Sequence, residues 1–330
     1  KVSIELNGSV TRTLELIDYK PLGYPTKFGI DPKTIGGQAA TRLQIHIPIK
    51  DKTDMRDIRF ASASNIDGLS YPKLLNGVDL QQGKILLKVN GKGLEASGSG
   101  QFLDVPAELS WNETFNVEKG PSSKYTARVT ADEKQLEALG FPTVGLVSGP
   151  ASLEVEMWGR GSKIAGGKIH GDLKEAELIA EALSWRKPKG KAAQITFDFE
   201  LPEGEGARFE NLKLAGEEID VSGRLAFEVD GPPKIITMNK LILGPNNNLS
   251  GEGRLLPSGA YDISAKGVKA DISETMKEIS SSGGVTEDKS KGLAFDIDAR
   301  LDEVVLREGA VIKDVVASGS FDGDDFKHLS

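Results

Sequence analysis

The chain has 330 residues, of which 38% are hydrophobic, 27% are charged and 6% are aromatic, and its 38 glycines favour short strands joined by tight turns over a helical bundle. Its formal net charge of -8 argues against a nucleic-acid partner, because phosphate binding depends on lysine and arginine displacing counterions. The lack of cysteine excludes disulfides and thiolate chemistry, and no apolar run of about 18 residues predicts a membrane-spanning helix.

Residues 41–49 show the first regular pattern along the chain. Leu43, Ile45 and Ile47 alternate with polar residues such as His46, and this period of two places them on one face of a strand. The same pattern recurs later and adds the apolar residues Leu153, Val155, Ile195, Phe197, Phe199, Leu225, Phe227, Val229, Phe295 and Ile297. Clean alternation is typical of antiparallel sheets with one solvated face, so we predict a mainly β fold of this kind.

Turn signals separate these segments at short intervals, which favours sequential hairpins in a long curved meander. The signals are Asn7-Gly8, Asn76-Gly77, Asn90-Gly91, Pro202-Glu203-Gly204, Gly231-Pro232-Pro233, Gly244-Pro245-Asn246 and Pro257-Ser258-Gly259.

A degenerate Ser-Gly motif recurs within the predicted strands. Residues 96–102 resemble residues 249–255, and shorter versions occupy 221–225 and 317–321. Glycine inside a strand removes a side chain, so each copy is expected to mark a bulge or bend. The alternative is chance recurrence in a glycine-rich chain.

Two short amphipathic helices are expected, near 131–140 and 271–280. The first has Thr130 as its predicted N-cap and Glu133 at the third helical position, and the second opens at Asp271. A further helical turn is predicted after Tyr71.

The predicted organisation has three parts. Residues 1–280 form the repeated β-sheet with its capping helices, residues 281–290 form a flexible loop rich in serine and glycine, and residues 291–330 continue the repeat. We expect the chain to be a segment of a longer protein.

No catalytic constellation stands out. His46, His170 and His328 lack an accompanying G-x-S-x-G elbow, and the first two fall at polar positions of the strand pattern. We therefore predict a protein that is not an enzyme and has no cofactor, with a carbohydrate-active enzyme as a distant alternative.

Three charged or glycine-rich segments resemble ligand-binding motifs, but for each of them we favour a structural role over a functional one. Residues 159–168 lack the spacing of a phosphate loop and are predicted to be a hairpin turn. Residues 322–325 lack the calcium-loop pattern, so no metal site is predicted. The basic run 186–191 suits a solvated hairpin tip, with anionic headgroups as the alternative partner.

Several short motifs together resemble one protein family. They are Tyr24-Pro25, Gly29–Lys33, Gly36-Gly37, Pro106–Trp111, Val147–Pro150, Gly171–Leu178, Leu183–Gly190, Leu301–Leu306 and the strand from Asp314 to Phe321. The chain resembles the central region of YhdP-like members of the AsmA superfamily. This resemblance implies a periplasmic segment of a protein anchored in the bacterial inner membrane, with an elongated apolar β-groove that carries phospholipid toward the outer membrane.

The residues alone leave two interpretations of the apolar face open. It could line a groove that binds phospholipid acyl chains, with Leu43, Ile45, Phe197, Phe199 and the rest of the alternating set as its lining. It could instead be the core of self-packed β-sandwiches in an envelope scaffold that recruits protein partners.

Overall fold

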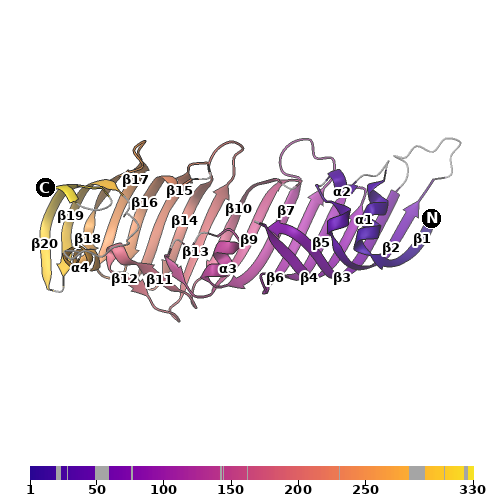
Figure 1. The fold of residues 1–330 in the computed structure, drawn as a ribbon, viewed down its shortest axis with the longest axis horizontal. Helices are drawn as coiled ribbons and strands as arrows, with labels where there is room; N and C mark the ends of the chain where they lie inside the picture. The colour runs from indigo at the N-terminus through magenta and orange to yellow at the C-terminus, as the bar shows by residue number, and fades with distance from the viewer. Residues whose placement is uncertain are drawn as a thin grey trace. The chain divides into compact units, whose positions relative to one another are not determined.

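The computed structural model describes residues 1–19, 24–27, 29–48, 59–75, 77–141, 143, 145–161, 163–229, 231–281, 294–307, 309–322 and 326–330 (Figure 1). The chain forms two compact units. Unit 1 comprises Lys1–Thr143 and Ser152–Lys168, and unit 2 comprises Val144–Ala151 and Ile169–Ser330.

Unit 1 is built mainly from strands that follow one another in the sheet. They are β1 (Val2–Ser9), β2 (Gly36–His46), β3 (Arg59–Leu75), β4 (Val78–Asn90), β5 (Gly93–Phe102), β6 (Val105–Thr114), β7 (Ser123–Ala131) and most of β9 (Ala151–Arg160). Its helices are α1 (Val10–Asp18), α2 (Tyr24–Lys27), the 3-10 turn η1 (Pro32–Thr34) and α3 (Glu133–Ala138).

Unit 2 continues the same construction, and β10 (Lys163–Asp172) begins in unit 1 and ends in unit 2. The long strands are β13 (Ala193–Glu200), β14 (Arg208–Gly216), β15 (Ile219–Phe227), β16 (Pro233–Leu243), β17 (Asn247–Leu255), β18 (Tyr261–Asp271), β19 (Phe295–Arg307), β20 (Ala310–Phe321) and β21 (Phe326–Leu329). The shorter elements are β8 (Val147–Ser148), β11 (Glu177–Ala180), η3 (Glu181–Leu183), β12 (Trp185–Lys187) and α4 (Ser273–Ser281).

The predicted mainly β, antiparallel fold is confirmed. Among the described residues, backbone pairing assigns 18 strands to one sheet and β8, β11 and β12 to a second, small sheet. Consecutive strands pair antiparallel from β2 to β7 and from β13 to β18. The exception is β19, which pairs parallel to β18 with Tyr261 opposite Phe295. Parallel neighbours need a crossover connection, and α4 lies in this one.

Five of the seven predicted turns lie between described strands, and the prediction at Asn7-Gly8 is wrong. In the remaining signal, Asn76-Gly77, Asn76 lies outside the described residues. Gly8 pairs with Ala39 inside β1, and the chain changes direction only after Ser9. The Ser9 side chain accepts a hydrogen bond from the Arg12 backbone N–H and caps α1, which was not predicted.

The predicted helical turn after Tyr71 is also wrong. Tyr71 pairs with Leu80, and β3 continues through Pro72 to Leu75. The register shifts between Tyr71 and Leu75, and a proline that cannot donate a ladder hydrogen bond is tolerated at such an irregularity.

Both predicted helices exist, but the N-cap of the first lies two residues later than predicted. Asp132, not Thr130, is the N-cap of α3, and it forms a capping box with Gln135. Thr130 remains in β7, where its hydroxyl lies 2.7 Å from the Ser152 hydroxyl of β9. In the second helix, Asp271 accepts from the backbone N–H of Ser273 at 3.0 Å, close to the predicted start. Residues 282–290 of the predicted flexible loop lie outside the described residues.

The repeated Ser-Gly motif lies at or beside irregular pairing in all four of its copies. In the copy at 317–321, the pairing of β20 with β21 shifts between Ser320 and Phe321. Gly98 pairs with Ile85 beside a register shift in β4, Gly223 lies at a shift against β16, and Gly251 pairs with Met238 at another. A Cβ atom on Gly98 would overlap the carbonyl oxygen of Lys84. Glycine is therefore required where the neighbouring backbone approaches most closely.

Replacing Gly98 with alanine should destabilise unit 1 by about 2 kcal/mol, because the new methyl group displaces the β4 backbone. The measurement is the shift of the urea midpoint. Gly91→Ala is the matched control, since nothing lies within 4 Å of a Cβ built there. Equal effects of the two substitutions would contradict the proposed crowding.

A buried polar network ties the small sheet to the ends of β16, β17 and β18 in unit 2. The Asn247 side chain is less than 2% exposed and donates to the carbonyls of Leu183 at 3.0 Å and Leu243 at 3.2 Å. Its oxygen accepts from the Asp271 backbone N–H at 2.9 Å. Ser184 accepts from the Glu274 backbone N–H at 2.9 Å, which fixes the first turn of α4 to the same network.

Asn247→Leu should cost about 3 kcal/mol of unfolding free energy, because it leaves two buried carbonyls and one buried N–H without partners. Chemical denaturation monitored by circular dichroism measures the loss. The exposed neighbour Asn248→Ala should change stability by less than about 0.5 kcal/mol. A neutral Asn247→Leu variant would show that the network does not hold the small sheet in place.

Candidate functional site

The candidate site is the apolar face of the strands, which each unit presents separately. In unit 2 the cross-strand register places apolar side chains next to one another. Leu214 lies opposite Val221, Val221 opposite Leu241, and Leu241 opposite Leu249. A second row joins Leu225, Ile236, Gly253, Ile263 and Ile297. We call the side of β13–β20 that carries these two rows the apolar face of unit 2.

Most side chains on this face are half-buried although they lie at the centre of the sheet. Examples are Ile195, Phe197, Leu225, Ile236 and Ile263, each of which is partly accessible to solvent. Residues on the inner face of a β-sandwich are covered by a second sheet and become largely inaccessible. Here the side chains are shielded by their own neighbours instead.

Most of the fully buried apolar residues of unit 2 lie toward one end of the strands, whereas Phe199 and Tyr261 are buried at the opposite end. Ala270, Leu301 and Val304 form a core cluster with Ile272 and Leu249 packed against it, where β18 leads into α4. Leu243, at the end of β16 beside Asn247, is 5% exposed. The packed core therefore sits where α4 and η3 meet the sheet and does not extend across the apolar face.

Phenylalanine side chains line the opposite ends of three adjacent strands. The ring centroids of Phe197 and Phe209 are 5.2 Å apart, and those of Phe209 and Phe227 are 5.1 Å apart. Offset aromatic pairs at these distances attract beyond simple area burial. The three rings form a ladder across β13, β14 and β15 at this end of the apolar face.

Unit 1 covers part of its apolar face with its own chain. Leu80 of β4 and Phe102 of β5 are opposite each other and are 2% and 4% exposed. Gly68, Lys73 and Gln82 adopt positive φ near the β3–β4 turn, which lets these two strands bend sharply. In Figure 1 the ends of β3 and β4 cross in front of neighbouring strands of the unit.

An aromatic and carboxylate cluster lies on β6 and β7 of unit 1. The rings of Trp111 and Tyr125 stack with centroids 5.9 Å apart, and Glu113, 5% exposed, accepts hydrogen bonds from Trp111 and Ser123. Burial raises the pKa of the Tyr125 phenol, the Ser123 hydrogen bond lowers it, and the charges of Glu113 and Tyr71 raise it further. Every polar group of this cluster that is fully buried has a partner, so the cluster stabilises the hairpin.

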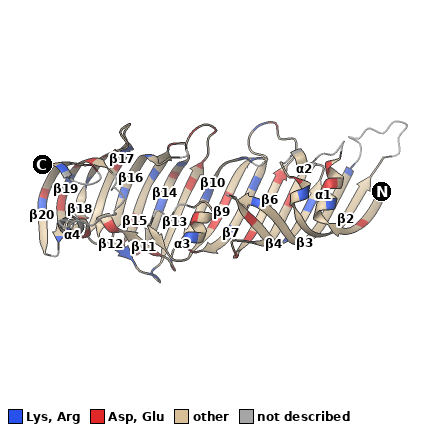
Figure 2. Cartoon of the chain, in the orientation of Figure 1, with Lys and Arg blue, Asp and Glu red and all other residues tan. Residues whose placement is uncertain are grey.

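The face opposite the apolar one carries ion pairs between neighbouring strands. Figure 2 shows basic and acidic positions on neighbouring strands of the sheet. Arg128 of β7 contacts Glu108 of β6 and Glu154 of β9, each at 2.9 Å, and Lys124 contacts Glu156 at 2.8 Å. These side chains are more than half exposed, so each pair contributes little stability. These charged side chains keep this face of the sheet in contact with water.

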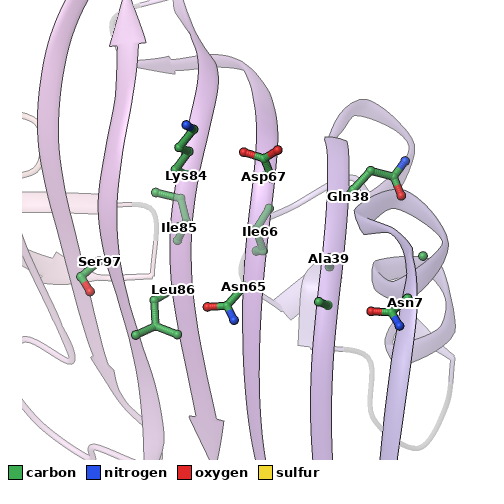
Figure 3. Close-up of a pocket in the computed structure, with 12 residues that line it drawn as sticks. Asn7, Gln38, Ala39, Asn65, Ile66, Asp67, Lys84, Ile85, Leu86 and Ser97 are labelled. Carbon is green, nitrogen blue, oxygen red and sulfur yellow. The ribbon is translucent and has the colours of Figure 1, made fainter.

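A shallow hollow on unit 1 contains none of the predicted lining residues. It spans β1 to β5, and Figure 3 shows Asn7, Asn65 and Leu86 in one row beside Asp67 and Lys84. These side chains alternate with Ile66 and Ile85, so they belong to the solvated side of the strands.

The predicted lining residues fall into four groups. Leu43 and Ile45 are half-buried in β2, and Ile195, Phe197, Leu225, Phe227, Phe295 and Ile297 are half-buried in unit 2. Leu153, Val155 and Phe199 are 6%, 3% and 9% exposed and belong to the packed part of their units. Ile47 and Val229, which are 49% and 58% exposed, lie beyond the ends of β2 and β15. β2 ends at His46, shortly before Pro48, which lacks an N–H to extend the ladder.

The search for chemistry gives few candidates in the described part of the chain. It contains no cluster of three or more histidine and acidic residues able to hold a metal. His46, His170 and His328 are exposed. Residues 160 and 163 end β9 and begin β10, as predicted for a hairpin there.

The basic run 186–191 corrects one prediction. Lys187 is not at a solvated tip but is 2% exposed, and its Nζ donates to the carbonyls of Ala176, Pro188 and Lys191. Burial lowers its pKa, against the opposing effect of nearby carboxylates. Arg186 pairs with Glu177 at 3.0 Å, so this segment stabilises the small sheet.

Comparison with protein-family models, curated proteins and solved structures finds no match. Within the described residues, no helix has the length and apolar character needed to span a membrane.

Tyr261 supplies a pH-dependent test of the packing at the aromatic end of unit 2. It is 5% exposed, its hydroxyl donates to the Pro233 carbonyl, and burial raises the pKa of the phenol. Above the unfolded pKa of about 10 the unfolded chain loses this proton first, so the stability contributed by Tyr261 is lost as pH rises further. We expect the melting temperature to fall more steeply from pH 10 to 11 in the natural chain than in Tyr261→Phe. Parallel curves would show that the phenol is not buried in solution.

Proposed function

We propose that the chain binds phospholipid acyl chains on its apolar face, as a segment of a periplasmic protein anchored in the inner membrane that carries lipid between the two membranes. The observation that carries this proposal is the half-burial of the aliphatic and aromatic side chains across the middle of β13–β19. Removing such an apolar surface from water lowers the free energy, and a bound apolar ligand can do this.

The energetics favour an acyl chain as that cover. Burying one methylene contributes about 0.8 kcal/mol, so a chain of about sixteen carbons gains up to ~12 kcal/mol before ordering costs. The rows through Leu225 and Leu241 consist of leucine, isoleucine, valine and glycine without a charged side chain. Such a surface holds hydrocarbon without fixing its position, which suits lateral movement.

The wider context of the proposal comes from the family resemblance. The resemblance to YhdP-like proteins of the AsmA superfamily implies a periplasmic location and the movement of lipid between the inner and outer membranes. The partners proposed are phospholipids, with envelope proteins as further partners of the longer protein. No chemical step is proposed.

Phe197→Glu should abolish co-purification of phospholipid while leaving the fold intact, because the half-buried glutamate reaches solvent but repels hydrocarbon. Native mass spectrometry and lipid extraction measure occupancy, and thermal unfolding measures the fold. Thr196→Glu, exposed on the other face of the same strand, is the matched control and should retain lipid.

A contrasting substitution separates lipid loss from unfolding. Leu243→Glu places an unpaired carboxylate at a site only 5% exposed and should unfold unit 2. If Phe197→Glu behaved like Leu243→Glu, the apolar face would be a packed core, and the proposal would fail. A natural chain free of lipid would also refute it.

A further inference from the structure

The two ends of the strands in unit 2 differ in chemistry. At one end, which we call the aromatic rim, lie Phe197, Phe199, Phe209, Phe227, Tyr261, Phe295 and Phe321. Phe295 and Phe321 continue the aromatic contacts, with ring centroids 5.4 Å apart. Although these residues come from six strands, every one belongs to the half of its strand that adjoins this rim.

The other end, which we call the closed rim, is occupied by the small sheet and α4. The network of Asn247, Asp271 and Ser184 seals it, and the Trp185 ring lies 3.2 Å from the position of a Cβ on Gly244. In Figure 1, β11, β12 and α4 lie along one side of the unit 2 strands, and the turn after β17 lies along the other. Polar groups entering at the closed rim would have to break this buried network.

Charged side chains of both signs stand at the aromatic rim. Arg208 pairs with Glu205 and lies 3.9 Å from Glu200, and Lys234 lies 3.2 Å from Glu228. Their side chains are 42–59% exposed, so they remain hydrated and can exchange partners. A head group with a phosphate and an amine complements a row that offers both cations and carboxylates.

A phospholipid on the apolar face has to keep its charged head group in water, because burying an unpaired charge costs far more than it returns. Exposed ion pairs such as Lys277–Glu274 also lie near the closed rim, but there the buried network blocks the approach to the apolar face. The aromatic rim combines hydration, complementary charges and an open apolar approach. We infer that unit 2 binds zwitterionic phospholipid in one orientation, with the head group at the aromatic rim and the acyl chains over Leu241 and Leu249 toward the closed rim. This inference rests on the proposed function and adds the polarity of the bound lipid.

The absence of natural cysteine allows a direct test, since a single introduced cysteine is labelled uniquely. Phe227→Cys reports the aromatic rim, Leu249→Cys reports the part of the apolar face next to the closed rim, and Glu252→Cys reports the solvated side of β17 as a control. Each variant of the full chain carries a bimane fluorophore. It is loaded from phosphatidylcholine vesicles with a nitroxide on either the head group or the end of one acyl chain.

The expected result is a crossed pattern of fluorescence loss. The head-group nitroxide should quench the label at 227 more than the label at 249, the chain-end nitroxide should reverse that order, and the label at 252 should respond to neither. Equal or opposite quenching at 227 and 249, with lipid bound, would overturn the orientation and leave lipid binding standing. No quenching at any position, with no lipid in the native mass spectrum of the unlabelled chain, would overturn the proposed function and this inference with it.

Discussion

Backbone hydrogen bonds between neighbouring strands carry the architecture of both units, because the apolar face is not closed by a second layer. Each inner strand is held on two edges by ladder bonds, and side chains add contacts within one face. The buried clusters around Val10 and around Ala270 lie only where helices meet the sheet. A protein built this way can leave apolar side chains half-exposed without losing its fold, and that combination makes ligand binding on the face compatible with stability.

Glycine has a particular part in such a sheet. Gly98 and Gly223 stand where an added methyl group would overlap the backbone of the next strand. The strand register shifts beside both glycines, so the repeated Ser-Gly motif coincides with irregular strand pairing. Larger residues at these positions would force the strands apart and interrupt the ladder on which the unit depends.

Alternation of apolar and polar residues predicted the strand class, the antiparallel pairing and the half-buried face around Phe197 and Ile297, since this signal is local. Features that depend on distant contacts escaped prediction. Lys187 is charged and follows an arginine, yet its ammonium group donates to three backbone carbonyls, those of Ala176, Pro188 and Lys191. The fully buried Asn247 directly follows the predicted turn at residues 244–246 and has no sequence signal of its own, since only the fold brings Leu183 and Asp271 to it. β2 ends before Ile47 because Pro48 lacks the N–H needed to extend the ladder, so this strand end could have been predicted from the sequence.

The parallel pairing of β18 and β19 interrupts the regular alternation of strand direction in the sheet. In an uninterrupted antiparallel order the turn after β19 would fall at the aromatic rim, but β19 runs with β18, so the β19–β20 turn falls at the closed rim instead. Phe321 is thereby returned to the same rim as Phe295. The parallel pair therefore moves the next turn to the opposite rim while Phe295 and Phe321 stay at the aromatic rim. A pair of this kind can join two antiparallel hairpin units whose turns lie at opposite ends of the strands.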